Sequence, residues 1–216
     1  MTISHHPPDD LLADYAVGAL PEAEHLVVAV HAAGCARCQR FVRTMETLAG
    51  AALADGPPAP PVPGEFETVM ERIARSPPAE PQDERPRPGD PELADLPELL
   101  QSCRIGPRRW VGPGLTTRPI LLAPAGKCRA FLLHAQPGTR LIQHTHTGDE
   151  LTCVLKGSYT DHHHRYEAGD LDFSDEEVEH ELVVGDDGPC LCLVALTGDL
   201  KLHGLFGRLI SPFVRL

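Results

Sequence analysis

Three residues with metal-binding side chains lie close together near the start of the chain, in the stretch "VVAVHAAGCARCQRF". His31, Cys35 and Cys38 follow the spacing H-x3-C-x2-C. Imidazole nitrogen and thiolate sulfur are the usual ligands of structural zinc, which is nearly always four-coordinate. The spacing therefore predicts three ligands of a structural zinc site, and it requires a fourth ligand from elsewhere in the chain.

The local sequence predicts helices on both sides of these residues. "PEAEHLVVAVHAAG" begins with a proline suited to a first helical turn and ends on Gly34, and "CARCQRFVRTMETLAGAALA" follows as another helix. If one helix continues through Gly34, the three residues share a face. If Gly34 ends the helix, the cysteines start the next one, where the helix dipole favours thiolate. Either geometry brings the three ligands together. The alternative is that Cys35 and Cys38 are a redox pair, since a C-x2-C motif alone would also suit redox chemistry.

The fourth ligand must come from another histidine. His5 and His6 stand on a short arm ahead of the first helix, and this arm can swing onto the site. His25 lies on the same predicted helix as His31 but points to another face, because six residues separate them. From spacing alone, His5 and His6 both remain candidates.

A second group of metal-binding side chains lies in "GTRLIQHTHTGDELTCVLKG", which reads G-x5-H-x-H-x3-E-x6-G. His144 and His146 alternate on a predicted strand, so they point to the same side of a sheet. Glu150 follows a turn at Gly148 and can face them from the next strand. His180 comes later, and two histidines, a carboxylate and a third histidine suit a first-row divalent metal.

This second group resembles the cupin pattern. The cupin pattern consists of two motifs. The stretch quoted above matches the first motif at every fixed position, whereas the later part of the chain matches the second motif only at Gly169 and His180. Asp175, Glu177 and Val184 replace the residues typical of catalytic cupins. The pattern implies that His144, His146, Glu150 and His180 hold Zn²⁺ or another divalent metal.

Several other reactive side chains are expected to be structural. The tract "HHH", residues 162–164, falls on a predicted turn and reads as a solvated hairpin. Cys190 and Cys192 point the same way on one strand, and we expect core thiols there, with redox sensitivity as the alternative. Four further side chains are also expected to be buried in the core: Cys103, Cys128, Cys153 and Trp110.

The chain divides into three parts by composition. Residues 1–76 predict a small all-α bundle, with a first helix capped by Asp9 or Asp10 and a short last helix, "EFETVMERIAR". Residues 77–93 belong to a Pro-rich stretch, where regular structure is disfavoured. Residues 94–216 hold short β-prone runs separated by Gly, Pro and Asp, which predicts an all-β jelly-roll barrel of the cupin kind. The expected fold is therefore multidomain α+β.

Bulk properties narrow the classes of function. The formal net charge of -12 argues against direct binding of nucleic acid, which needs a basic surface. The apolar runs are too short to cross a membrane. The start "MTISHHPPDD" has neither a basic region nor an apolar run, so no secretory signal is expected and the predicted location is the cytoplasm.

The two motifs in this order, with a Pro-rich tether between them, resemble the ChrR-type zinc-binding anti-sigma factors. In that family an upstream histidine completes the zinc site, which implies His6 as the fourth ligand, with His5 as the alternative. The resemblance implies that the helical module binds and inhibits a group IV (ECF) sigma factor. It also implies that the cupin-like module is a sensor, which releases the sigma factor on an oxidative signal such as singlet oxygen or an organic hydroperoxide.

A metal-dependent cupin enzyme, such as a dioxygenase or isomerase with a helical appendix, is the alternative function. The sequence offers no clear general base beside the predicted cupin ligands. An enzyme would also give no reason for the predicted zinc site at the front of the chain. We therefore expect a regulator without enzymatic activity.

Overall fold

The computed structural model describes residues 3–60, 62–76, 93, 95–122, 128–141, 144–162, 164–175 and 182–202. Within β4 and β11, the side chains of residues 144, 146 and 200–202 lie outside this description. The helices are α1 (Asp9–Ala16), α2 (Glu22–Gly34), α3 (Ala36–Asp55), α4 (Glu65–Arg75) and α5 (Glu98–Gln101). The strands are β1 (Arg109–Gly112), β2 (Leu115–Ile120), β3 (Cys128–Ala135), β4 (His144–His146), β5 (Glu150–Lys156), β6 (Ser158–Asp161), β7 (His164–Glu167), β8 (Leu171–Ser174), β9 (Leu182–Val184), β10 (Cys190–Thr197) and β11 (Leu200–Leu202).

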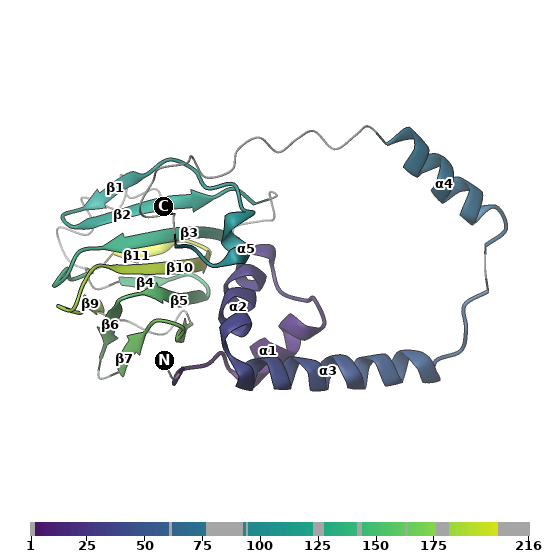
Figure 1. The fold of residues 1–216 in the computed structure, drawn as a ribbon, viewed down its shortest axis with the longest axis horizontal. Helices are drawn as coiled ribbons and strands as arrows, with labels where there is room; N and C mark the ends of the chain where they lie inside the picture. Colours follow the sequence, from purple (N-terminus) through teal and green to yellow (C-terminus); the bar gives the residue numbers. More distant parts are fainter. Residues whose placement is uncertain are drawn as a thin grey trace.

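The strands form antiparallel sheets. The largest has the order β1-β2-β3-β10-β5-β8, and two smaller sheets have the orders β7-β6-β9 and β11-β4. Figure 1 shows these sheets as one module, with the helices on one side of it. The prediction of a helical part followed by an all-β part is confirmed, although the described strands form three sheets rather than a single closed barrel.

The central strand β10 is buried on both faces, and this explains its nearly continuous apolar sequence. Cys192, Val194 and Leu196 join a core cluster with residues of β3, β6 and β9. Leu193 and Ala195, which alternate with them, join the other core cluster, together with residues of α2. Alternate side chains of a strand point to opposite faces. The β module therefore has an inner core between its sheets and an outer face covered by a helix.

Helix α2 packs the helical part against the β part. Val27 and Val28 are fully buried and pack in the same cluster as Leu132 and Leu193 of the large sheet. Glu24, also buried, accepts a hydrogen bond from the hydroxyl of Thr197 at 2.7 Å. The helical part and the β part therefore share one hydrophobic cluster.

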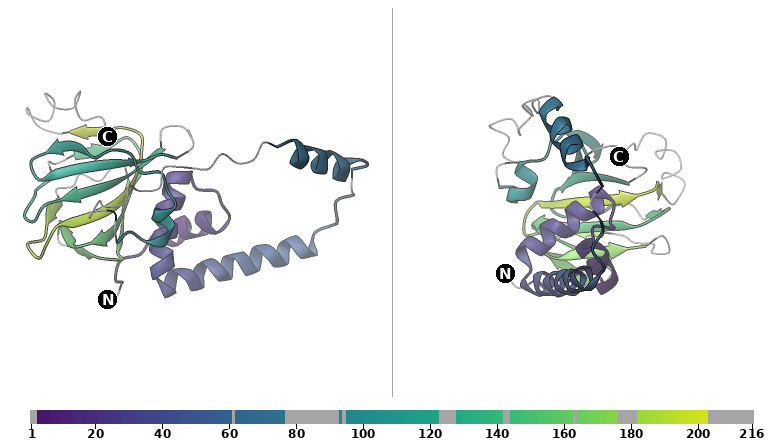
Figure 2. Two further views of the ribbon diagram at one scale, coloured as in Figure 1. Left: turned by 45° about the horizontal axis from the view of Figure 1, so that its top comes forward. Right: turned by 90° about the vertical axis from the view of Figure 1, so that its right-hand side faces the viewer.

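Helices α3 and α4 extend away from this shared core. Figure 1 and the left view of Figure 2 show α3 running outward from the end of α2, with α4 apart from the rest of the fold. Cys38 is the buried residue of α3, and α4 has no buried residue. The apolar face predicted for α4 is present but uncovered: Phe66 is 72% exposed and Ile73 62%.

Two local predictions are wrong. Trp110 is 73% exposed, because β1 is an edge strand of the large sheet and its side chain is left uncovered. The first helix begins after Pro8, which makes no side-chain capping bond, rather than after Asp9 or Asp10. Both aspartates lie in the first turn, where carboxylates are favourable to the helix dipole.

Candidate metal centre

Four side chains converge where α2 meets α3. One ligand atom from each of His6, His31, Cys35 and Cys38 lies within 4.8 Å of all the others. His31 Nε2 is 3.3 Å from Cys38 Sγ, and His6 Nδ1 is 3.3 Å from Cys35 Sγ and 3.6 Å from Cys38 Sγ. A tetrahedral zinc ion would set such nitrogen–sulfur separations at about 3.6 Å, given its usual bond lengths. The cluster could therefore hold a metal ion.

The helix break at Gly34 places three of these residues. Helix α2 ends at Gly34, and Cys35 has extended backbone angles, φ -109° and ψ 103°, as the residue before α3. Cys38 then lies in the first turn of α3, where the helix dipole favours a negative sulfur. Of the two geometries considered for this spacing, the structure has the one in which the cysteines start a new helix.

Of the three histidines considered as the fourth ligand, His6 is the one that contacts the cysteines. His6 points its Nδ1 at both cysteine sulfurs. His5 instead lies with its Nδ1 3.3 Å from the carboxylate of Asp170 and its ring against Tyr166. The ring of His25 packs on Tyr15 at 4.5 Å.

Burial controls the charge of the cluster. Burial raises the pKa of the Cys38 thiol to about 12, with the nearby Cys35 acting in the same direction. Burial also lowers the pKa values of His6 and His31. The imidazoles are thus held neutral, as metal binding requires, whereas the thiols need a nearby cation to lose their protons. A buried set of four protein ligands is typical of a structural site.

A turn of the β module orients His31. Its Nδ1 lies 2.8 Å from the carbonyl oxygen of Gly169, between β7 and β8. A carbonyl only accepts, so Nδ1 carries the proton and Nε2 is left as the lone-pair nitrogen facing Cys38. Spacing rules gave no signal for this partner, because 138 residues separate the two.

The second predicted metal group is described only in part. Glu150 is buried at the start of β5 and accepts a hydrogen bond from Thr152 at 3.3 Å. Its neighbours along a cavity inside the β module include Tyr159, Cys190 and Cys192. The backbone of His144 and His146 forms β4, but their side chains and the whole of His180 lie outside the described residues.

The other cysteines are mostly placed as predicted. Cys190 and Cys192 are buried with their sulfur atoms 3.6 Å apart, and Cys153 is buried beneath the other face of the sheet. Cys103 and Cys128 are only half-buried, so they are less enclosed than predicted. In the histidine tract, His162 lies at the β6–β7 turn and His164 is exposed, as expected for a hairpin; His163 lies outside the described residues.

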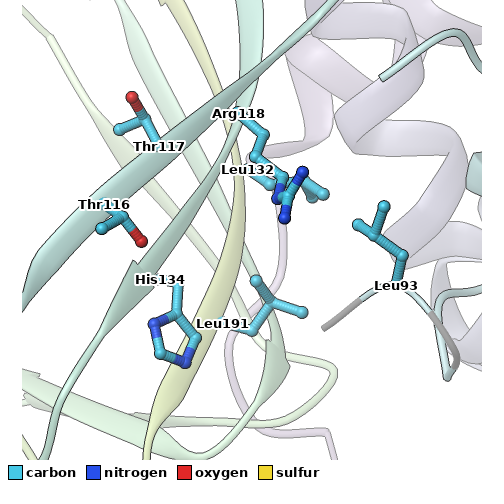
Figure 3. A pocket seen from close by; sticks show the side chains of 7 residues that line it. All are labelled: Leu93, Thr116, Thr117, Arg118, Leu132, His134 and Leu191. Atoms are coloured by element: carbon cyan, nitrogen blue, oxygen red, sulfur yellow. The ribbon is translucent and has the colours of Figure 1, made fainter. Parts of the chain in front are cut away.

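A separate small pocket lies on the outer face of the large sheet. Figure 3 shows its lining, with Leu93 on one side and, on the sheet, Arg118 of β2, Leu132 and His134 of β3 and Leu191 of β10. None of the predicted metal ligands lines it. Among the described residues, no helix is long and apolar enough to span a bilayer.

Comparisons with known proteins agree with this two-part organisation. Residues 103–198 match the family described as the ChrR cupin-like domain. The anti-sigma-E factor ChrR of Cereibacter sphaeroides is 34% identical over 220 residues, which covers all of both chains. The crystal structure of Rhodobacter sphaeroides SigE in complex with the anti-sigma ChrR matches with a TM-score of 0.70 and 30% identity, over 90% of this chain and 99% of that chain.

The fold and the cluster together define a two-module protein, in which a helical module with a His2Cys2 site packs on a cupin-like module. Since the likeness extends over the full length of the relative, the chain belongs to the ChrR family.

Proposed function

We propose that this protein is an anti-sigma factor that binds and inhibits an ECF-type sigma factor, and that it is not an enzyme. The observation that carries the proposal is the likeness, over 90% of this chain, to the ChrR chain of the solved complex with SigE. The net charge of -12 suits a partner with basic regions that face DNA. A cytoplasmic location follows from this proposed partner, since RNA polymerase works there.

The surface proposed to meet the sigma factor is the apolar face of α4, formed by Phe66, Val69, Met70 and Ile73. These side chains are 44–72% exposed, and they follow the i, i+3, i+4, i+7 spacing of one helix face. An amphipathic helix laid into a partner's groove is a common mode of recognition. A monomeric protein rarely leaves such a continuous apolar patch uncovered, and binding would cover it.

Zinc is the metal proposed for the His6, His31, Cys35 and Cys38 cluster. Two thiolates and two imidazoles in a closed tetrahedral set are the donors that zinc prefers. Zinc would hold the N-terminal arm, the end of α2 and the start of α3 together. In a helical module of 76 residues, this bracing would offset a small hydrophobic core.

We assign three regions: a helical anti-sigma domain at residues 1–76, a linker at 77–93 and a cupin-like sensor domain at 94–216. The sensor is proposed to hold a divalent metal through His144, His146, Glu150 and His180 and to release the sigma factor on an oxidative signal, such as singlet oxygen or an organic hydroperoxide. The buried position of Glu150 on the internal cavity supports a site there.

Transcription in a purified system tests the inhibitory function. RNA polymerase core enzyme is combined with an ECF-type sigma factor from the same organism, and transcripts are measured as the protein is added. We expect transcription to fall to background near a 1:1 ratio of protein to sigma factor. Polymerase with its housekeeping sigma factor is the control and should be unaffected; unchanged transcription in both reactions would contradict the proposal.

A further inference from the structure

The N-terminal arm that carries His6 is hydrogen-bonded to the β module. The backbone N–H groups of Ser4 and His5 donate to the Asp170 carboxylate at 2.7 and 3.0 Å. The N–H of Leu171 in turn donates to the carbonyl of His5 at 3.2 Å. The arm therefore runs along the start of β8 immediately before it reaches the metal-binding cluster.

Asp170 is suited to hold this arm. It is 2% exposed, and its carboxylate also accepts the N–H of Glu167, which fixes its orientation within the β7–β8 turn. Burial alone would raise the pKa of Asp170, but the N–H groups of Glu167, His5 and Ser4 outweigh it and lower that pKa. A buried carboxylate that accepts several N–H groups is a strong and specific anchor.

Gly169, the neighbouring residue, makes two further contributions. Its carbonyl accepts the Nδ1 proton of His31 at 2.8 Å. Its φ is +98°, and a Cβ atom there would lie 2.8 Å from Cγ1 of Ile3. Glycine is needed both for this backbone conformation and for the close approach of the arm.

We propose that Gly169 and Asp170, in the β7–β8 turn, are positioning residues for the metal site of the helical module. Asp170 holds the arm that presents His6, and Gly169 sets the tautomer and ring orientation of His31. Both histidine ligands are thus positioned by the cupin-like module, whereas Cys35 and Cys38 are positioned by α3. The metal site is shared between the modules, and displacement of the β7–β8 turn weakens it. This inference rests on the proposal that the cluster holds zinc.

The test measures metal retention in the full-length protein. Asp170→Asn keeps the size of the side chain but removes its charge, and Gly169→Ala pushes the arm away while keeping the carboxylate. Asp187→Asn is the matched control, because Asp187 bonds Ser158 and Arg165 in the same module and is not part of the arm contacts. Zinc transfer to a chromogenic chelator gives a rate, and cobalt substitution gives a thiolate charge-transfer band. That band reports only a site with cysteine ligands.

We expect both variants of the turn to bind the metal roughly 10–100-fold more weakly, the range usual for loss of partners that orient metal ligands. Their cobalt bands should weaken or shift, while Asp187→Asn matches the unaltered protein. Equal retention in all four proteins would overturn the inference and leave the metal site standing. An unaltered protein with no metal on the cysteines would overturn the metal proposal itself. Circular dichroism checks folding, and loss of the whole fold in both variants would make the turn structural and contradict a positioning role.

Discussion

His31 bonds to both modules at once: its Nε2 lies 3.3 Å from Cys38 Sγ in the helical part, and its Nδ1 lies 2.8 Å from the Gly169 carbonyl in the β part. Such a partner on the second ring nitrogen fixes the tautomer and strengthens a ligand. A change in the cupin-like module therefore has a short physical route to the metal-binding cluster.

Replacing either cysteine of the cluster should remove the metal and destabilise the helical module. Structural zinc contributes folding free energy on the order of 10 kcal/mol in small zinc peptides at neutral pH. Cys35→Ser and Cys38→Ser should therefore lose bound zinc and sigma-factor binding together, whereas His6→Ala should lose less if His5 substitutes. Metal analysis and a binding titration measure this. The control is Cys103→Ser, a half-buried thiol outside the cluster; tight binding by both cysteine variants would show that zinc does not organise the binding surface.

A charge on the apolar face of α4 should weaken sigma-factor binding without affecting the fold. Ile73→Asp buries a carboxylate in the proposed interface, and a loss of roughly 30-fold or more in affinity is expected, as for a hot-spot residue. Thr68→Asp adds the same charge on the opposite face of the helix and should bind normally. Calorimetric titration compares the two variants; equal affinities would place the interface elsewhere.

Changes at the proposed cupin ligands should leave inhibition in place and abolish release. Glu150→Gln, His144→Ala, His146→Ala and His180→Ala alter the proposed sensor site but none of the four residues of the His2Cys2 cluster. A sensor needs two states that differ in their affinity for the partner, and loss of the site should remove one of them. The measurement is transcription from a sigma-dependent promoter with and without singlet oxygen. Normal induction in the His144→Ala and His180→Ala variants would refute the sensor role.

A fragment cut within the linker should bind the sigma factor but be less stable than the whole protein. Residues 1–85 retain the cluster and α4, but the cut uncovers Val27 and Val28, which are fully buried against the sheet. Exposing one such side chain costs about 1.5–3 kcal/mol. Thermal unfolding compares fragment and whole chain, and a pull-down tests binding. A folded fragment that fails to inhibit would contradict the proposed division of the chain.

The thiols of Cys190 and Cys192 should resist alkylation in the folded protein. Their mutual contact and burial raise the pKa of Cys192 well above its usual value, so little thiolate forms at neutral pH. Mass spectrometry after brief treatment with iodoacetamide should show label at the half-buried Cys103 before these two. Label at Cys192 as fast as at Cys103 would contradict the assignment of a core thiol.

The part of the site that could be predicted from the sequence is the part made by neighbouring residues. His31, Cys35 and Cys38 lie within one helix–break–helix segment, so local geometry gathers them. Only the family resemblance favours His6 over His5, because an arm outside any helix or strand has no periodicity that could rank the two. Asp170 gave no signal, since 165 residues separate it from His5 and a Gly-Asp pair reads simply as a turn.

The fold shows the same division between local and long-range information. The periodicity of α4 and the apolar run of β10 predicted their structures, because each reports the surroundings of one element. The prediction that Trp110 lies in the core is wrong, because its exposure depends on which strand lies at the edge of the sheet. The packing of α2 on the β module was likewise not predicted, since it depends on the tertiary arrangement of both modules.

Native mass spectrometry of the protein co-expressed with an ECF-type sigma factor from the same organism tests the central claim most directly. The account predicts one dominant species of one sigma chain and one chain of this protein, and at least one zinc ion that is lost in the Cys35→Ser variant. A spectrum that shows only free sigma factor and free, zinc-loaded protein, with no complex of the two, would contradict the account.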